Sequence, residues 1–415
     1  MTDAASVIAE IAAPPSPPPD VFLTDEQLAD ITASLRARPP AENRSLRDVI
    51  PEGRGRIPPE EYIARVKKAQ QLGMKSVFHL LNVHHSDDIE NPAKCIIAGG
   101  GPSLFDNIPT IRKLRRQGAK IIACNRSHDE LRAKFIPVEY GILLDPKDWV
   151  ADYISPRHNS KYLLASQVHE KTFEKFAGYD AYLWHAAAGL GELEMLQKEF
   201  GEHEWISFLG PSVVGLRAIY LALYLGFREI HLMGIDGSGK PPRYKCGCYA
   251  PTLEPVGVCL NHGEQELAGD SGKLYSYAKP KTDPTFAWFT LNAKKTGFKH
   301  HYWSNHHMAR SVYEFEDQIK RIDELMMLSA KCIEEGKPPH LPPFSLKVHG
   351  NPEYSAIAML AAAYNLHADP RMNDAAREPP ASGMMGFMPS DTEPPESERP
   401  GFDKGQVWPK KERKQ

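Results

Sequence analysis

Lys94-Cys-Ile-Ile-Ala-Gly-Gly-Gly-Pro-Ser103-Leu104 is the stretch of sequence that decides the fold. The apolar run from Cys95 to Ala98 is short and predicts a buried β-strand. The glycines that follow it predict a tight turn. Beyond the turn, apolar residues recur at helical spacing and predict a helix that begins near Ser103; they are Leu104, Ile108, Ile111 and Leu114.

Ser103 and Asp106 have the spacing of a capping box, which marks the first turn of a helix. A strand, a glycine turn and a capped helix place backbone N–H groups and the positive end of a helix in front of an anion. We therefore expect the turn to hold the phosphate of a nucleotide, through Gly99, Gly100, Gly101, Pro102 and Ser103. The alternative is a turn that needs glycine for steric reasons alone.

The composition is that of an ordinary globular protein. The 415 residues are 41% hydrophobic and 25% charged, with a net charge of −3. This balance gives no global attraction to nucleic acid or to a membrane surface. No apolar run reaches the roughly 18 residues of a membrane span, and the N-terminus lacks the pattern of a signal peptide. The six cysteines are few for this length, so we expect a cytoplasmic protein.

The two ends of the chain differ in composition from its middle. Residues 1–20 are rich in Ala, Pro and Ser, and residues 368–415 in Pro, Met and Gly, so both are expected to be disordered. Between them we predict an N-terminal helical segment at 21–91, an α/β domain at 92–305 with an insert at 237–283, and C-terminal helices at 306–367.

From about residue 92 the pattern alternates between short apolar runs and helical segments. Strands are predicted over 94–98, 120–124, 138–144, 161–165, 181–184, 229–233 and 299–303. Such alternation predicts an α/β fold with a mostly parallel sheet and helices on both faces. Ligands of these sheets bind at the carboxyl ends of the strands, so the residues that follow each strand matter.

Small or polar hydrogen-bonding residues follow several of the predicted strands. They are Asn125, Asp145, Ser166, Asp236 and Ser304. If the sheet is parallel, these side chains meet along one edge and can line a ligand site. Each of them taken alone is equally consistent with an ordinary turn or a helix cap.

A mostly apolar helix precedes the strand at 229–233. We expect it to begin near Ser212, to end at Gly226 and to be buried, because it is apolar on nearly every side. Gly215 in its first turn allows a close approach, either by a ligand or by a neighbouring strand.

Three segments in this order, 96–104, 123–125 and 222–236, resemble the MptE-like family. That family includes the archaeal 6-hydroxymethylpterin diphosphokinase and is related to the motility accessory factors that glycosylate flagellin. The same segments are similar to the bacterial CMP-sialic-acid sialyltransferases. The resemblance covers about residues 92–305 and implies a Rossmann-like fold, a nucleotide at the strand ends and a transferase.

The sequence departs from the sialyltransferase pattern at three places. Gly100 stands where those enzymes have an asparagine that contacts the nucleotide. Of their Thr-Ser-Gly before the apolar helix, only the glycine, Gly215, is matched. Their catalytic histidine aligns near 277–283, where this chain has none. The motifs by which the pterin kinase binds magnesium and pyrophosphate are not recognisable either.

The insert at 237–283 has no periodicity and follows a strand on the expected ligand edge, which is typical of a lid. It carries Cys246, Cys248, Cys259 and His262. Three thiolates and an imidazole are the ligands of a structural zinc site, although the Cys-Xaa-Cys spacing is unusual for one. The alternatives are a loop with free thiols, or His262 acting as the general base.

The favoured hypothesis is a nucleotide-dependent glycosyltransferase with a CMP-type sugar donor. In it the turn and Asn125 hold the nucleotide together with Ser166, Gly215 and Ser304, and Asp145 and Asp236 bind ribose hydroxyls or a metal. The second hypothesis is a diphosphokinase that uses ATP and Mg²⁺, with the two aspartates as metal ligands. The third is a nucleotide-binding or structural module without catalysis. The sequence indicates no acceptor.

Overall fold

The structure is a computed structural model whose described residues are 57–86, 88, 90–186, 195–196, 198–200, 208, 210–250, 255–259, 261–269, 271, 287–293, 298–337, 339 and 341–375. All of them lie in one compact unit, residues 1–377. The predictions of disorder at residues 1–20 and 376–415 fall outside the described residues. Residues 368–375, expected to belong to the disordered tail, are described instead, and Pro370–Ala375 forms the helix α11 with Met372 buried.

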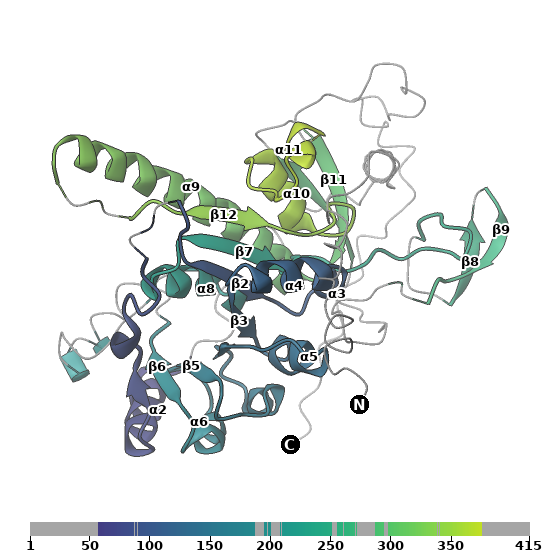
Figure 1. Cartoon of the computed structure of the whole chain (residues 1–415). Coiled ribbons are helices and arrows are strands. Elements are labelled where there is room, and N and C mark those ends of the chain that lie inside the picture. The colour runs from purple at the N-terminus through teal and green to yellow at the C-terminus, as the bar shows by residue number, and fades with distance from the viewer. Residues whose placement is uncertain are drawn as a thin grey trace, which may run out of the picture. The chain divides into compact units, whose positions relative to one another are not determined.

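An eight-stranded parallel sheet forms the centre of this unit, as predicted from the alternation of strands and helices (Figure 1). Its strand order is β1-β6-β5-β4-β3-β2-β7-β12, and every neighbouring pair is parallel. The strands are β1 (Lys75–Ser76), β2 (Lys94–Ala98), β3 (Lys120–Cys124), β4 (Tyr140–Leu143), β5 (Lys161–Ala165), β6 (Ala181–Trp184), β7 (Glu229–Met233) and β12 (Ser345–Val348).

Helices cover both faces of the sheet. Alternate residues of each strand point to opposite faces, so neighbouring residues pack against different helices. Ile96 packs in one cluster with α3 (Ser103–Asp106), α4 (Ile108–Arg116) and α5 (Ser127–Ala133). Ile97 packs in the other with α2 (Pro59–Gln71), α6 (Glu170–Phe176) and the predicted apolar helix, α8 (Val214–Tyr224). Full burial of each isoleucine stabilises the fold by roughly 1.5–3 kcal/mol.

The strand order reverses at β2. The chain runs outward from β2 through β3, β4, β5 and β6, and then returns to place β7 on the other side of β2. At such a switch point the loops beyond the carboxyl ends of the two strands leave in opposite directions, which opens a place for a ligand. The glycine turn after β2 and the loop after β7 therefore frame the candidate site.

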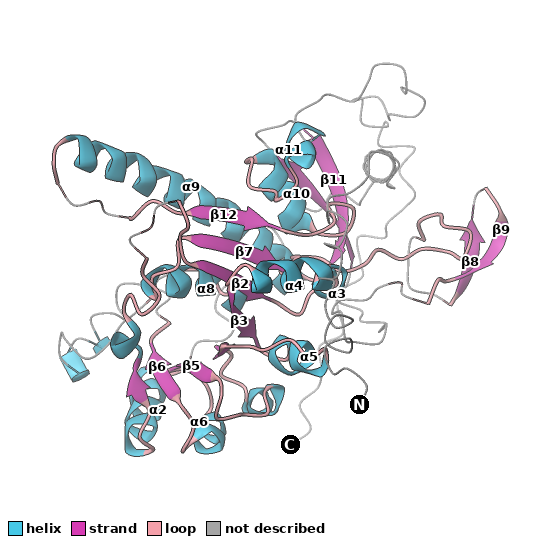
Figure 2. Cartoon of the chain, viewed as in Figure 1, coloured by secondary structure: helices cyan, strands magenta, loops and turns pink. Residues whose placement is uncertain are grey.

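One predicted strand is not part of the parallel sheet. Residues 299–303 fall in β11 (Phe298–Ser304), which pairs antiparallel with β10 (Ala287–Ala293) (Figure 2). Among the described residues the edge beside β7 belongs to β12 instead. Strand β12 has only four residues and follows two proline pairs, so its pattern is too short for a strand to be predicted, whereas β11 has a strong strand composition and finds a local partner.

The terminal segments contribute to the sheet as well as to its cover. The segment expected to be a helical appendage also supplies β1, which pairs with β6. The remaining elements are the 3₁₀ turns η2 (Val77–Leu80) and η3 (Asp148–Tyr153), the helices α9 (His306–Glu334), α10 (Ala356–Ala363) and α11 (Pro370–Ala375), and the hairpin β8 (Val256–Cys259) and β9 (Gly263–Glu266). Within the described part of the chain, no helix has both the length and the apolar character needed to cross a membrane.

Candidate functional site

The glycine turn after β2 packs directly against the turn after β7. Backbone bonds join Gly99 N–H to Met233 O at 2.8 Å and Gly101 N–H to Gly234 O at 2.7 Å. A Cβ at Gly99 would lie 2.3 Å from Gly234 O, and one at Gly234 would lie 2.4 Å from Gly99 O. The close backbone approach thus excludes any side chain at these two positions.

Asp236 lies at the start of α3, with both carboxylate oxygens bonded to Ser103. The Ser103 N–H donates to Oδ2 at 2.9 Å and the Ser103 hydroxyl donates to Oδ1 at 2.7 Å. Burial of the fully enclosed Asp236 carboxyl raises its pKa to about 6, although the Ser103 bonds oppose this shift. The protein therefore supplies its own anion to the N–H of Ser103.

This contact corrects the predicted capping box. Ser103 is the first residue of α3 rather than its cap, because its hydroxyl is engaged by Asp236 and also accepts from Gly234 N–H at 3.2 Å. The predicted continuous helix is divided at Asn107, after which α4 begins with Pro109 in its first turn.

Asn125 after β3 offers a buried acceptor that nothing in the described structure satisfies. Its backbone is left-handed, with φ of 55°, and its side-chain Oδ1 is buried without a hydrogen-bond partner among the described residues. Ser127 fixes this strand end beside β2, because its hydroxyl lies 2.7 Å from both Ala98 O and Cys124 O. No described residue accepts from the Gly100 N–H, the remaining donor of the glycine turn.

The segment before α10 contacts the same turn region. The Tyr354 hydroxyl donates to Asp106 Oδ2 on α3, and Tyr354 O accepts from the Ser238 hydroxyl at 2.6 Å. The Lys240 Nζ lies 5.5 Å from the centre of the Tyr354 ring. Sequence reasoning missed these residues, because no local motif marks them and only the fold brings them to the site.

Helix α2 lies against the carboxyl ends of β4 and β5. The Arg65 guanidinium donates to Gln167 O and, at 3.4 Å, to Pro146 O. Ser166, expected to contact nucleotide, is fully buried and bonds its hydroxyl to that of Tyr62 on α2. Helix α2, whose sequence carries no catalytic or binding motif, thus covers the carboxyl ends of β4 and β5.

The other sequence-predicted positions are dispersed. Asp145 is exposed and accepts from Lys147 N–H at 3.0 Å. Its strand, β4, is separated from β7 by β3 and β2, about 14 Å across the sheet, whereas the buried Asp236 follows β7. Ser304 bonds its hydroxyl to Gly237 O at 2.8 Å.

The space beside Gly215 is filled by the side chain of Ile235. A Cβ there would lie 2.6 Å from Ile235 Cδ1, so the close approach is made by the residue between Gly234 and Asp236. Helix α8 begins at Val214, after the predicted start at Ser212, because the Ser212 N–H and hydroxyl both bond Glu314.

The cysteines and the histidine of the insert come together at the hairpin β8–β9. The ligand atoms of Cys246, Cys248, Cys259 and His262 all lie within 4.8 Å of one another. A hydrogen bond from His262 lowers the pKa of the Cys259 thiol to about 6. These are the described side chains whose chemistry suits a bound metal.

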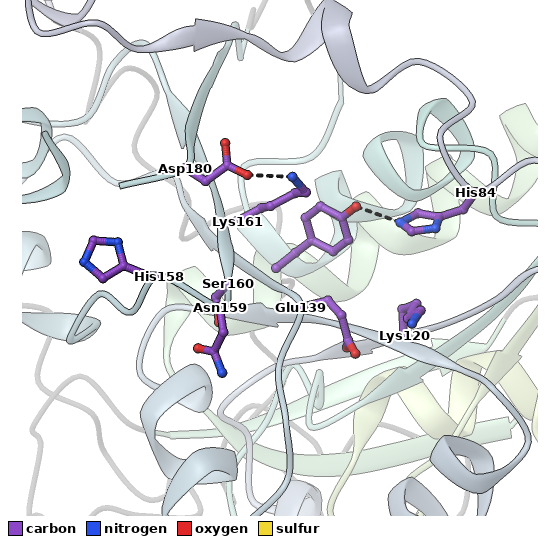
Figure 3. A pocket seen from close by; sticks show the side chains of 9 residues that line it. His84, Lys120, Glu139, His158, Asn159, Ser160, Lys161 and Asp180 are labelled. Atoms are coloured by element: carbon purple, nitrogen blue, oxygen red, sulfur yellow. Dashed lines mark hydrogen bonds and ion pairs between the residues drawn. The ribbon is translucent and has the colours of Figure 1, made fainter. Parts of the chain in front are cut away.

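A cavity of about 280 Å³ lies at the amino ends of the strands, away from the candidate site (Figure 3). Its lining includes Lys161 and Tyr140, the first residues of β5 and β4. Lys161 pairs with Asp180 at 2.6 Å, and Tyr140 bonds His84 at 2.7 Å. These groups already hydrogen-bond to one another, and ligands of parallel sheets bind at the carboxyl ends of the strands rather than at the amino ends. We therefore do not place the functional site there.

Comparison with known proteins gives one family. Residues 73–240 match the model of the family described as 6-hydroxymethylpterin diphosphokinase MptE-like, which confirms the resemblance read from the sequence. The match runs from just before β1 to just after Asp236 and covers less than half of the chain. No curated protein matches this chain in sequence.

Two solved structures show distant likeness. One is the MAf glycosyltransferase from Magnetospirillum magneticum AMB-1, with 19% identity over 50% of this chain and 32% of that chain and a TM-score of 0.31. The other is a mammalian sialyltransferase in complex with Gal-beta-1-3GalNAc-ortho-nitrophenol, with 10% identity over 55% of this chain and 76% of that chain and a TM-score of 0.26. The aligned part therefore spans about a third of the MAf enzyme.

Proposed function

We propose that this chain is a nucleotide-dependent transferase, in its favoured form a glycosyltransferase with a CMP-type sugar donor. The observation that carries the proposal is that the family match, residues 73–240, contains both loops that meet at the switch point of the sheet. A transferase related to a diphosphokinase family needs a site for a nucleotide, and this is where α/β sheets bind one.

Asn125 supports a nucleotide at this place. An unpaired buried acceptor costs roughly 1–3 kcal/mol, so a ligand that donates to Oδ1 recovers that energy on binding. A ribose hydroxyl or a base amino group can be that donor. The Gly100 N–H, at the end of the neighbouring strand, then donates to a phosphate oxygen.

The geometry changes the roles expected at the turn. Because Asp236 already accepts from Ser103, we assign Asp236 to holding the turn rather than to a ribose or a metal. His262 belongs to the cysteine cluster of the insert, which leaves the general base unassigned.

The second candidate is a diphosphokinase, favoured by the activity for which the matching family is described. Its chemistry requires magnesium between carboxylates and phosphates. The expected pair, Asp145 and Asp236, does not fit that role, because one is exposed and the other is fully buried across the intervening strands. A module that binds nucleotide without catalysis is the third candidate.

A thermal-shift screen of the full chain tests the proposal. The ligands are CMP, CMP-sugars, UDP-sugars, and ATP with and without Mg²⁺. We expect CMP compounds to raise the melting temperature, since a ligand at about 100 times its Kd stabilises the folded state by about 2.7 kcal/mol. Stabilisation by ATP only with Mg²⁺ would favour the diphosphokinase instead.

Asn125→Ala is expected to remove the shift, because the ligand loses its acceptor. The control is Asn159→Ala, in the cavity at the amino ends of the strands, and this variant should keep the thermal shift. If no nucleotide raises the melting temperature of the wild-type chain, both enzyme candidates are wrong. If Asn125→Ala keeps the full shift, the nucleotide binds elsewhere.

A further inference from the structure

The hairpin β8–β9 brings sulfur and imidazole groups into one small cluster. Cys259 ends β8 and His262 lies in the turn to β9, while Cys246 and Cys248 come from the preceding loop. The loop is bound to the hairpin by Lys245 N–H to Glu266 O at 2.8 Å.

The distances in this cluster are those of a tetrahedral metal site. Cys246 Sγ lies 3.8 Å from Cys259 Sγ, and His262 Nδ1 lies 3.6 Å from Cys248 Sγ and 3.4 Å from Cys259 Sγ. Zinc bonds of about 2.3 Å to sulfur and about 2.0–2.1 Å to nitrogen give edges near 3.8 Å between sulfurs and near 3.6 Å between sulfur and nitrogen. A disulfide is not formed, because all the cysteines are free.

We propose that Cys246, Cys248, Cys259 and His262 bind one structural zinc ion that holds the insert in its folded form. The set fills four positions with protein ligands, which is the closed arrangement of a structural site rather than the open one of a catalytic site. This inference does not rest on the proposed transferase function.

The backbone is shaped to present these ligands. The His262 N–H donates to Cys259 O at 3.3 Å, which fixes the short turn that carries these two ligands. The unusual Cys-Xaa-Cys spacing is accommodated by Gly247, whose φ of 91° turns the chain between the two cysteines. Nothing lies within 4 Å of the Cβ position at Gly247, so the backbone conformation alone accounts for the glycine.

The described residues of the insert bury few apolar side chains. Its buried cluster contains Tyr244, Ala250 and Cys259, whereas Val256 and Val258 on β8 are exposed. A two-stranded hairpin is at best marginally stable in water, and small units commonly need a metal or a disulfide. A bound zinc ion provides that link between the loop and the hairpin.

The base of the insert contacts the segment before α10. Arg243 forms an ion pair with Glu353, and the Tyr249 hydroxyl donates to Glu353 at 3.3 Å. Glu353 precedes Tyr354, the residue bonded to Asp106 beside the glycine turn. Zinc in the insert therefore orders a loop whose base adjoins the candidate nucleotide site.

Metal analysis of the purified full chain tests the zinc site. We expect inductively coupled plasma mass spectrometry to find about one zinc ion per chain. Replacement by Co²⁺ should give the thiolate charge-transfer and visible bands of tetrahedral cobalt–sulfur coordination. Cys259→Ser and His262→Ala should each retain less than about a tenth of the zinc. The matched control, Cys332→Ser on α9, should retain all of it.

Two further measurements keep the test decisive if a variant folds poorly. Chelation of the wild-type chain should increase proteolytic cleavage within 237–271, and added Zn²⁺ should restore protection. Wild-type chain that takes up neither Zn²⁺ nor Co²⁺ at a stoichiometric level after reduction would overturn the proposal. Equal metal content in Cys259→Ser and in wild type would overturn it as well.

Discussion

Asp236 and Ser103 form a contact between residues that are 133 positions apart in the sequence. Gly101 leaves room for this carboxylate, whereas Gly99 leaves room for the Gly234 carbonyl. A Cβ at Gly101 would lie 2.4 Å from Asp236 Oδ2. The steric explanation of the glycine turn therefore accounts for Gly99 and Gly101.

The raised pKa of Asp236 gives a pH-dependent stability of definite sign. Because burial raises its folded-state pKa from 3.8 to about 6, the folded state binds a proton more tightly than the unfolded state does. Its contribution is fully present below about pH 4 and is lost as pH rises through about pH 6. Relative to Asp236→Asn, the wild-type chain should lose up to about 3 kcal/mol of unfolding free energy over that interval. Urea unfolding of both proteins across this range measures the difference; a constant difference would contradict the prediction.

Gly101→Ala is expected to destabilise the chain by roughly 1–3 kcal/mol or more, because the new methyl group must displace Asp236 or the Gly234 carbonyl. Gly269→Ala is the control, since a Cβ there meets nothing within 4 Å. Its effect should stay within about 0.5 kcal/mol. Chemical denaturation compares the two variants, and equal effects would show that the turn can relax.

At the scale of elements, the buried cation Arg65 links α2 to the loops that follow β4 and β5. Arg65→Met removes the bonds to Gln167 O and Pro146 O and the ion pair with Glu61, while it keeps the apolar stem of the side chain. We expect a loss of about 2–3 kcal/mol in unfolding free energy and faster amide exchange in α2. Lys67→Met, on the exposed side of the same helix, should have little effect. Unchanged exchange in the Arg65 variant would show that packing alone holds the helix.

The sequence predicts elements well where hydrophobic pattern and length agree. The strands at 94–98, 120–124, 161–165, 181–184 and 229–233 are all observed at their predicted bounds. Helix α9 begins at His306, where the predicted C-terminal helices begin, because the Asn305 side chain accepts from Met308 N–H at 2.9 Å and caps it.

Pairing partners and distant contacts are less predictable than elements. Nothing local in 298–304 distinguishes a parallel partner from the antiparallel β10. The Asp236–Ser103 bond, the Arg65 contacts and the position of Tyr354 all depend on which loops the fold brings together. The insert is an exception, because its ligand types alone predict the cluster that the structure assembles.

At the scale of the whole molecule, buried histidines govern the response to acid. Burial lowers the pKa of His185 to about 4 and also lowers the pKa values of His349 and His367. A histidine kept neutral in the folded state stabilises it above about pH 6.5, and this contribution is lost as pH falls toward about pH 4. His185 alone accounts for about 3 kcal/mol.

The expected result is a net loss of unfolding free energy between about pH 6.5 and about pH 4, despite the opposite contribution of Asp236. The strongly paired carboxyls of Asp180 and Glu229, with pKa values of about 2, titrate below this interval. Denaturant titrations at several pH values measure the loss. In His185→Gln the loss should be smaller by about 3 kcal/mol, and an unchanged loss would contradict the assignment.

The reversal of strand order at β2 has a consequence for synthesis of the chain. When β2 leaves the ribosome, β3 follows at once, but its other neighbour, β7, begins only at Glu229. At a translation rate of about 5–20 residues per second, the β7-facing edge of β2 stays without its partner for on the order of ten seconds. An unpaired apolar edge is a template for association with other chains. Nascent chains that stall before β7 should therefore aggregate or recruit chaperones, whereas chains that extend past β12, the other neighbour of β7, should not.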